Sequence, residues 1–266
     1  SGDCSWLNSV HFPNANIGYA VGSFGTILKT TDGGDTWLQQ NSGTDEFLNA
    51  VYFIDADAGY AVGPDGVILK TIDGGNNWMQ QESGIYDEIN SVHFIDEDTG
   101  YAVGYDCPIL KTTDAGNNWI QQTNNTSYKL YSVYFANVDT GYAVGSDGII
   151  LKTSNGGNSW RQQEIGISYD FKLESIHFLN ADTGYAVGDD GNILKTSTGG
   201  WCTGFPGKPQ GEINLCSPTD NYEYSTTSAP YAASYSWTLE PSEAGTINGT
   251  DTTATVTWSS TYHDTA

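Results

Sequence analysis

The stretch GYAVGPDGVILKTIDGGNNW, residues 59–78, decides the fold, because close copies of it recur along the chain. The string GYAVG occurs five times, and a Lys-Thr pair follows each copy. The copies start at Gly18, Gly59, Gly100, Gly141 and Gly184, at steps of 41, 41, 41 and 43 residues. A fixed period of this length indicates a fold built from stacked copies of one small unit. Residues shared by all copies are therefore expected to be structural, and residues found in one copy are better candidates for function.

Within the second repeat, four short apolar or aromatic runs are separated by Gly, Asp and Asn. The runs are residues 50–53, 60–63, 67–71 and 78–81. Such punctuation is typical of hairpin turns, and no helical periodicity is visible. Four antiparallel strands per repeat match one blade of a β-propeller, whose sheets stack because none can cover both of its faces alone. We predict an all-β protein with a five-bladed β-propeller.

We expect the five blades to close into a ring in which the two ends of the repeat region meet. Cys4 precedes the first repeat and Cys202 closes the last, so a Cys4–Cys202 disulfide would lock the ring. The chain-entropy model gives a bond across so long a loop about 4–5 kcal/mol. A disulfide would also indicate an oxidising compartment. The alternative is that these two cysteines, with Cys107 and Cys216, are unpaired thiols.

Three other repeated positions are expected to serve packing. A Trp before the fourth strand should lie between blades. One strand position alternates between His and Tyr, as at His11, Tyr52 and His93. The ring at this position should serve packing, with a polar group at its tip. The repeated lysines, such as Lys29, are expected to cover the neighbouring Trp or to pair with an acid.

The turn before each Trp resembles the Asp-box, S/T-x-D-x-G-x-T/S-W. In proteins with this motif the aspartate is structural and caps a hairpin turn. The resemblance assigns that structural role to Asp32, Trp37, Asp73, Trp78, Asp114, Trp119, Asn155 and Trp160. Asn155 departs from the motif, and the fifth copy is degenerate.

Two families share such units, the sialidases and the photosystem II assembly-factor family. The resemblance covers about residues 7–201, and the pattern of "SVHF", "DTGYAVG" and "ILKT" looks most like secreted surface proteins of Bacteroidota. It implies a BNR-like propeller in a secreted or cell-surface protein.

The composition changes after Trp201. Residues 205–210 are rich in Pro and Gly and indicate a linker. Later runs alternate apolar and polar residues, as half-buried strands do, and resemble PKD-like, immunoglobulin-type modules. We therefore divide the chain into a propeller (1–204), a linker (205–210) and a partial immunoglobulin-like β-sandwich (211–266), and we expect the sequence to be a fragment of a longer protein.

The charge excludes several classes of partner. Thirty-two acidic and nine basic residues give a net charge of −23, which opposes binding to nucleic acid or to anionic membranes. No apolar run is long enough for direct insertion into a membrane. Sialidase chemistry needs several arginines around a substrate carboxylate, and Arg161 is the single arginine. We therefore predict a protein that is not an enzyme. A polysaccharide-acting glycoside hydrolase or lyase is the alternative, because acids are plentiful.

Two faces of the propeller are candidates for binding. The turns between first and second strands and the Asp-box turns should share one face. There Asp55, Asp57, Asp96 and Asp98 offer oxygen ligands for Ca²⁺, although a solvated acidic rim is the simpler explanation. No cofactor is otherwise expected.

The opposite face should carry the remaining turns and the loops between blades, which vary most among the copies. Aromatic residues there suit a glycan or a protein, or else seal gaps between blades. These residues are Phe24, Phe47, Tyr86, Tyr105, Tyr128, Tyr131, Tyr169 and Phe171. The sequence thus favours a secreted or cell-surface binding or structural protein, an adhesion or assembly component in a larger extracellular assembly. Its partner would be a protein or a glycan, with self-assembly as a further alternative.

Overall fold

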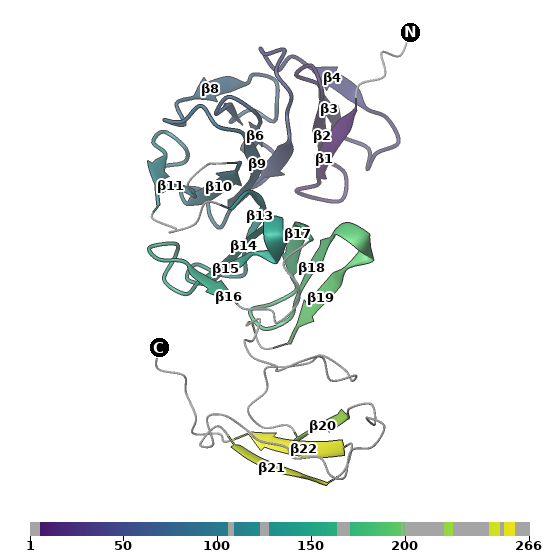
Figure 1. The fold of residues 1–266 in the computed structure, drawn as a ribbon. Coiled ribbons are helices and arrows are strands. Elements are labelled where there is room, and N and C mark those ends of the chain that lie inside the picture. The colour runs from purple at the N-terminus through teal and green to yellow at the C-terminus, as the bar shows by residue number, and fades with distance from the viewer. Residues whose placement is uncertain are drawn as a thin grey trace.

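The computed structural model describes residues 6–105, 109–122, 128–163, 171–197 and 199, and the backbone of three strands further along the chain. The described repeats form five antiparallel sheets (Figure 1). No helix among the described residues is long and apolar enough to cross a bilayer. The predicted all-β class is confirmed.

Each of the first four sheets has four strands in chain order, and three strands of the fifth are described. The first sheet holds β1 (Leu7–His11), β2 (Gly18–Gly22), β3 (Ile27–Thr30) and β4 (Leu38–Gln40). The second holds β5 (Ala50–Phe53), β6 (Gly59–Val62), β7 (Ile68–Thr71) and β8 (Met79–Gln81). The third holds β9 (Ile89–Phe94), β10 (Gly100–Gly104), β11 (Leu110–Thr112) and β12 (Ile120–Gln121).

The fourth sheet holds β13 (Leu130–Phe135), β14 (Gly141–Gly145), β15 (Ile150–Thr153) and β16 (Arg161–Gln163). The fifth holds β17 (Leu173–Phe178), β18 (Gly184–Gly188) and β19 (Ile193–Thr196). Short 3₁₀ turns η1 (Ser146–Gly148) and η2 (Asp189–Gly191) follow β14 and β18. In the second repeat, the strand limits agree with the sequence-based ones to within a residue.

A separate three-stranded antiparallel sheet has the order β20–β22–β21. Its strands are β20 (Asn221–Ser225), β21 (Gly245–Thr250) and β22 (Thr253–Trp258). They lie in the segment for which the sequence predicts an immunoglobulin-like module. The limits of that module and of the linker fall outside the described residues, so the domain boundaries stay predictions.

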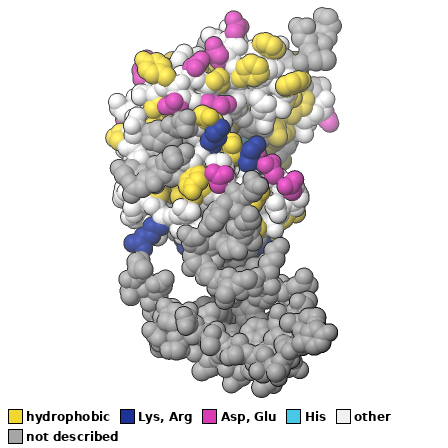
Figure 2. All heavy atoms as spheres, in the orientation of Figure 1, with side chains coloured by type: hydrophobic (Ala, Val, Ile, Leu, Met, Phe, Trp, Pro, Cys, Tyr) yellow, Lys and Arg dark blue, Asp and Glu magenta, His cyan; other side chains and the backbone are white. Residues whose placement is uncertain are grey.

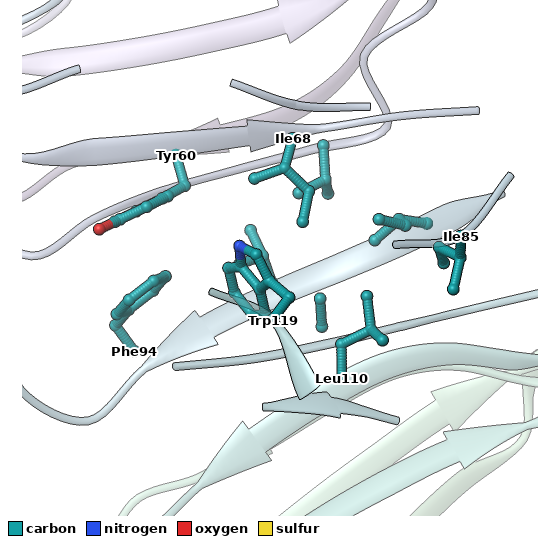
Figure 3. Close-up of a cluster of buried hydrophobic side chains, with 10 residues drawn as sticks. Tyr60, Ile68, Ile85, Phe94, Leu110 and Trp119 are labelled. Atoms are coloured by element: carbon teal, nitrogen blue, oxygen red, sulfur yellow. The ribbon is translucent and has the colours of Figure 1, made fainter. Parts of the chain in front are cut away.

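Consecutive sheets pack face to face around a common centre, and the first strands of neighbouring sheets lie side by side. At each interface a Tyr of GYAVG stacks on a Phe of the next sheet. Tyr60, 1% exposed, lies on Phe94 with ring centroids 4.0 Å apart and an interplanar angle of 15° (Figure 3). The same stack recurs as Tyr19–Phe53, Tyr101–Phe135 and Tyr142–Phe178.

Both glycines of GYAVG are required because atoms of neighbouring residues approach them closely. A Cβ on Gly59 would lie 2.5 Å from the ring of Phe53, and one on Gly63 would lie 2.1 Å from the carbonyl oxygen of Phe47. Neither contact is tolerated by real side chains, so the strand is held against its neighbours only if both positions lack a side chain.

The first and last described sheets leave their outer faces uncovered, contrary to the closed ring expected from the sequence. Val10 is 61% exposed, whereas Val51, Val92, Val133 and Ile176 at the same repeat position are 4–5% exposed. Ile193 of the fifth sheet is 70% exposed, whereas Ile27 and Ile68 are fully buried.

An open hollow of about 470 Å³ lies on the uncovered face of the first sheet. Its lining is Leu7, Asn8, Ser9, Val10, Ala20, Leu28 and Trp37.

Candidate functional site

One face of the arc is built from the turns after the second strands and the loops between sheets, as the repeat pattern predicts. Among the described residues, backbone hydrogen bonds join three of these turns to the loop beside them. Gly25 N–H donates to Glu46 O at 2.7 Å, and Gly66 N–H donates to Asp87 O at 2.9 Å. Gly148 N–H bonds Phe171 O at 2.8 Å in the same way. We call this surface the loop face.

The turns of the loop face hold a residue in the left-handed conformation, followed by Gly. Asp65, Asp147 and Asp190 have φ between 54° and 56°, and Phe24 has φ 57°. Asp tolerates this conformation because its short side chain can bond locally, whereas a bulky side chain there is an outlier. Phe24 is therefore the exceptional member of the set.

The structure divides the eight candidate aromatic residues. Phe24, Phe47, Tyr86 and Tyr105 are exposed by 69%, 43%, 91% and 37%. The rings of Phe24 and Phe47 lie 5.7 Å apart. By contrast, Tyr128 and Phe171 pack against the hydrophobic clusters between sheets, so these two help to seal the gaps. Tyr131 is half-buried, and Tyr169 lies outside the described residues.

Charged side chains accompany the exposed aromatics. Asp45, Glu46, Asp65, Asp87 and Glu88 are all exposed. The amide of Asn49 donates to Glu88 Oε1 at 3.1 Å. Between the third and fourth repeats, Lys129 Nζ lies 3.6 Å from the centroid of the Tyr105 ring. The loop face thus offers acids near its first two sheets and a cation–π pair further on.

The opposite face uses its carboxylates to hold turns. Asp55 Oδ1 accepts from the backbone N–H groups of Asp57 and Ala58, both at 2.7 Å. Asp96 Oδ1 accepts in the same way from Asp98 and Thr99. Within the part of the chain that the structure describes, no three His, Cys, Asp or Glu side chains come together as a metal site. The geometry therefore adds nothing in favour of the calcium hypothesis.

The Asp-box turns lie on that face too, because Gly74 N–H donates to Asp57 O at 2.9 Å. Asp73 accepts from the backbone and side-chain amides of Asn77 at 2.9 and 2.7 Å. These bonds, the side-chain one foremost, lower the pKa of Asp73. Asn155 accepts from the Ser159 N–H at 3.0 Å, so the amide holds its turn like a carboxylate.

The repeated Trp residues border the cores between sheets. Trp119 and Trp160 are 8% and 7% exposed and belong to the buried clusters, and Trp78 packs against another. The indole N–H of Trp37 donates to Gly34 O at 3.1 Å. The buried indole nitrogens of Trp78, Trp119 and Trp160 have no hydrogen-bond partner in the structure.

The repeated lysines connect each sheet to the next one. Lys29 Nζ lies 5.6 Å from the centroid of Tyr19 in its own sheet and donates to Gly74 O of the next sheet at 2.7 Å. The Tyr19 hydroxyl donates to the same carbonyl at 3.0 Å. The lysine and the tyrosine therefore both tie their own sheet to the neighbouring Asp-box turn.

The alternating His and Tyr side chains form a continuous belt along the inner strands. Successive ring centroids from His11 through Tyr52, His93 and Tyr134 to His177 are 4.7, 4.9, 4.9 and 5.0 Å apart. Burial, together with the charges of His11 and His177, lowers the pKa of His93 to about 4. The belt belongs to the packing of the inner strands.

Sequence reasoning missed two sets of residues. The Tyr side chains of GYAVG were not singled out, although Tyr19, Tyr60, Tyr101 and Tyr142 are among the largest fully buried side chains. Their invariance was the available signal. Trp6, 77% exposed beside the loop face, was also missed because it precedes the first repeated string. Cys4 and Cys202 lie outside the described residues, so their disulfide stays a prediction.

Comparison with known sequences places these repeats in a family. The sequence model described as photosynthesis system II assembly factor YCF48 matches residues 4–80, 39–126 and 121–214. The chain belongs to the YCF48 family. No curated protein sequence matches it.

Solved structures support the propeller fold. A GH74 xyloglucanase from Xanthomonas campestris is 12% identical over 74% of this chain and 37% of its own, with a TM-score of 0.59. The WD40 propeller domain of Doa1 is 16% identical over 74% and 67%, with a TM-score of 0.58. A structure of YCF48 bound to D1 peptide is 17% identical over 73% and 94%, with a TM-score of 0.41. The chain spans little more than a third of the xyloglucanase.

Proposed function

We propose that this chain is a protein-binding propeller, not an enzyme, and that its loop face carries the binding site. The observation that supports the proposal is the set of exposed aromatics at positions that vary between repeats, Phe24, Phe47, Tyr86 and Tyr105. Exposed aromatics that folding does not use are typical of protein interfaces. Membership of an assembly-factor family agrees with this function, and a YCF48 structure holds a D1 peptide.

We place the protein outside the cell or at its surface, as an adhesion or assembly component of a larger structure. The net charge of −23 suits such a setting and opposes nucleic-acid binding. A polysaccharide-acting hydrolase is the alternative. The GH74 enzymes among the structural neighbours share only the propeller fold with this chain.

Site-specific photo-crosslinking tests the proposal. A photoreactive phenylalanine analogue replaces Tyr86 on the loop face, or Ile72, which is 61% exposed in the Asp-box turn on the opposite face. With the native extracellular fraction, we expect a discrete protein adduct from position 86 and none from position 72. Equal crosslinking from both positions would contradict the loop-face site. Release of reducing sugar from a polysaccharide panel would favour the hydrolase instead.

A further inference from the structure

Phe24 is an anomaly that folding does not explain. The equivalent residues Asp65, Asp147 and Asp190 share its left-handed conformation, with φ near 55°. A bulky aromatic side chain is disfavoured there, and Phe24 is 69% exposed, so little burial offsets the strain. A strained residue that the fold does not need points to a functional role.

Two further aromatic residues accompany Phe24. The Phe47 ring lies 5.7 Å from the Phe24 ring. Trp6 is bonded to the residue before Phe24: Ser23 N–H donates to Trp6 O, and Trp6 N–H donates to Ser23 Oγ, both at 2.9 Å. Phe24 and Phe47 therefore form an exposed aromatic pair, and the exposed Trp6 is bonded through its backbone to the residue before Phe24. We call these three residues of the first two sheets the aromatic patch.

The patch is confined to these two repeats. Trp6 and Phe47 each place a carbonyl against the last glycine of the adjoining GYAVG string. In the later repeats the same place is taken by Glu88, Lys129 and Lys172. A patch that the repeat itself required would recur in every copy, so selection on the fold does not account for it.

Carboxylates border the aromatic patch. Glu46 directly precedes Phe47, and its carbonyl accepts from Gly25, the neighbour of Phe24. Asp45 is exposed two residues before Phe47, and Asp65 is exposed in the turn that follows Gly63, the glycine packed on the Phe47 carbonyl. In Figure 2, hydrophobic and acidic side chains lie together over the upper part of the molecule, where Figure 1 places the first two sheets.

We infer that the aromatic patch binds a basic, apolar polypeptide segment, in which Lys or Arg side chains alternate with large apolar ones. The apolar side chains would pack on Phe24 and Phe47, and the cationic heads would reach Glu46 and Asp65. A chain with a net charge of −23 repels acidic segments, which fixes the sign of the partner. This inference rests on the proposed protein-binding function of the loop face.

Defined peptides test this chemistry. The full chain is titrated into fluorescent peptides of about twelve residues that alternate Lys with Leu, Glu with Leu, or Lys with Ser. We expect the Lys/Leu peptide to bind at least about tenfold more tightly than either control, and its affinity to fall as salt is raised. Binding of Lys/Ser as tight as that of Lys/Leu would overturn the role of the aromatic patch. Tighter binding of Glu/Leu would overturn the sign of the partner.

A pair of variants with the same change in charge locates the site. Phe24→Asp installs the residue of the other repeats, and Ile72→Asp adds the same carboxylate on the opposite face. If the overall negative charge alone attracted the peptide, both variants would bind the Lys/Leu peptide more tightly than the wild type. The aromatic patch predicts that Phe24→Asp weakens binding at least about tenfold while Ile72→Asp does not.

Thermal unfolding separates lost binding from lost folding. Because Asp accepts the left-handed turn more readily than Phe, the Phe24→Asp variant is expected to melt at or above the wild-type temperature. A variant that melts lower would overturn the premise that Phe24 is strained and not needed by the fold, and unchanged binding in a stable variant would overturn the role of the patch. If position 86 crosslinks a protein while no Lys/Leu peptide binds, the proposed function stands and this partner chemistry fails.

Discussion

At the scale of single residues, the Asp-box shows how a side chain replaces missing strand partners. Asp73 joins the two sides of its turn by accepting from Asn77, and the Thr71 hydroxyl bonds both Asp73 and the Gly75 N–H. Asp73 is half-buried at the surface and lies outside the core, so it contributes by fixing the turn. Asn155 shows that an oxygen acceptor suffices at this position.

This equivalence predicts the outcome of two substitutions. Asp73→Asn keeps the acceptor for the Asn77 backbone N–H and should melt close to the wild type. Asp73→Ala removes the acceptor and should melt at a clearly lower temperature. Differential scanning calorimetry of the two variants checks this, and equal melting of both would show that the turn does not need the side chain.

At the scale of elements, the inner strands are tied together by the belt of His and Tyr rings. Phe53 N–H donates to His11 Nδ1 at 3.2 Å, and the Tyr52 hydroxyl donates to Phe94 O at 2.9 Å. These two rings therefore bond the next sheet while contacting their neighbours in the belt at a tilt. His and Tyr are interchangeable here because both are flat rings with a polar edge.

The belt predicts a loss of stability in mild acid. Burial first, and then His11 and His177, lower the pKa of folded His93 to about 4, against 6.5 when unfolded. Above pH 6.5 both states are neutral and the stability is complete. As the pH falls from 6.5 to about 4, the unfolded state takes up the proton first, and the free energy of unfolding drops by up to about 3 kcal/mol.

His93→Tyr provides the control, because Tyr occupies the same position in two neighbouring sheets. The variant should lose most of the pH dependence between 6.5 and 4 in urea unfolding, leaving the smaller share of His11, whose pKa burial also lowers. A pH profile as steep as that of the wild type would assign the acid sensitivity to other groups.

At the scale of the whole molecule, stability comes from interfaces between sheets, and the two ends of the arc lack one half of an interface each. Val51 and Val10 occupy the same repeat position, but Val51 is 5% exposed and Val10 is 61% exposed. The same substitution at the two sites therefore measures what an interface contributes.

We expect Val51→Asp to lower the free energy of unfolding by more than about 3 kcal/mol, because it buries an unpaired charge. Val10→Asp should change it by no more than about 0.5–1 kcal/mol, as surface substitutions do. Denaturant titration of both variants checks the contrast. Equal losses would mean that the first sheet is covered in solution.

The sequence by itself determined the repeat unit, its strands and its turns, because glycines, turn acids and alternating apolar residues act over a few neighbouring positions. It also predicted that the Asp-box serves the fold and that aromatic residues of the variable loops gather on one face. Only the tertiary structure decided that Tyr60 stacks on Phe94, that Lys29 reaches the next sheet and that Phe171 packs inside while Phe24 stays outside. It likewise decided that the described arc stays open. Those outcomes depend on how neighbouring sheets pack on each other. Many small contacts between residues about forty positions apart set that packing, so no short stretch of sequence reveals it.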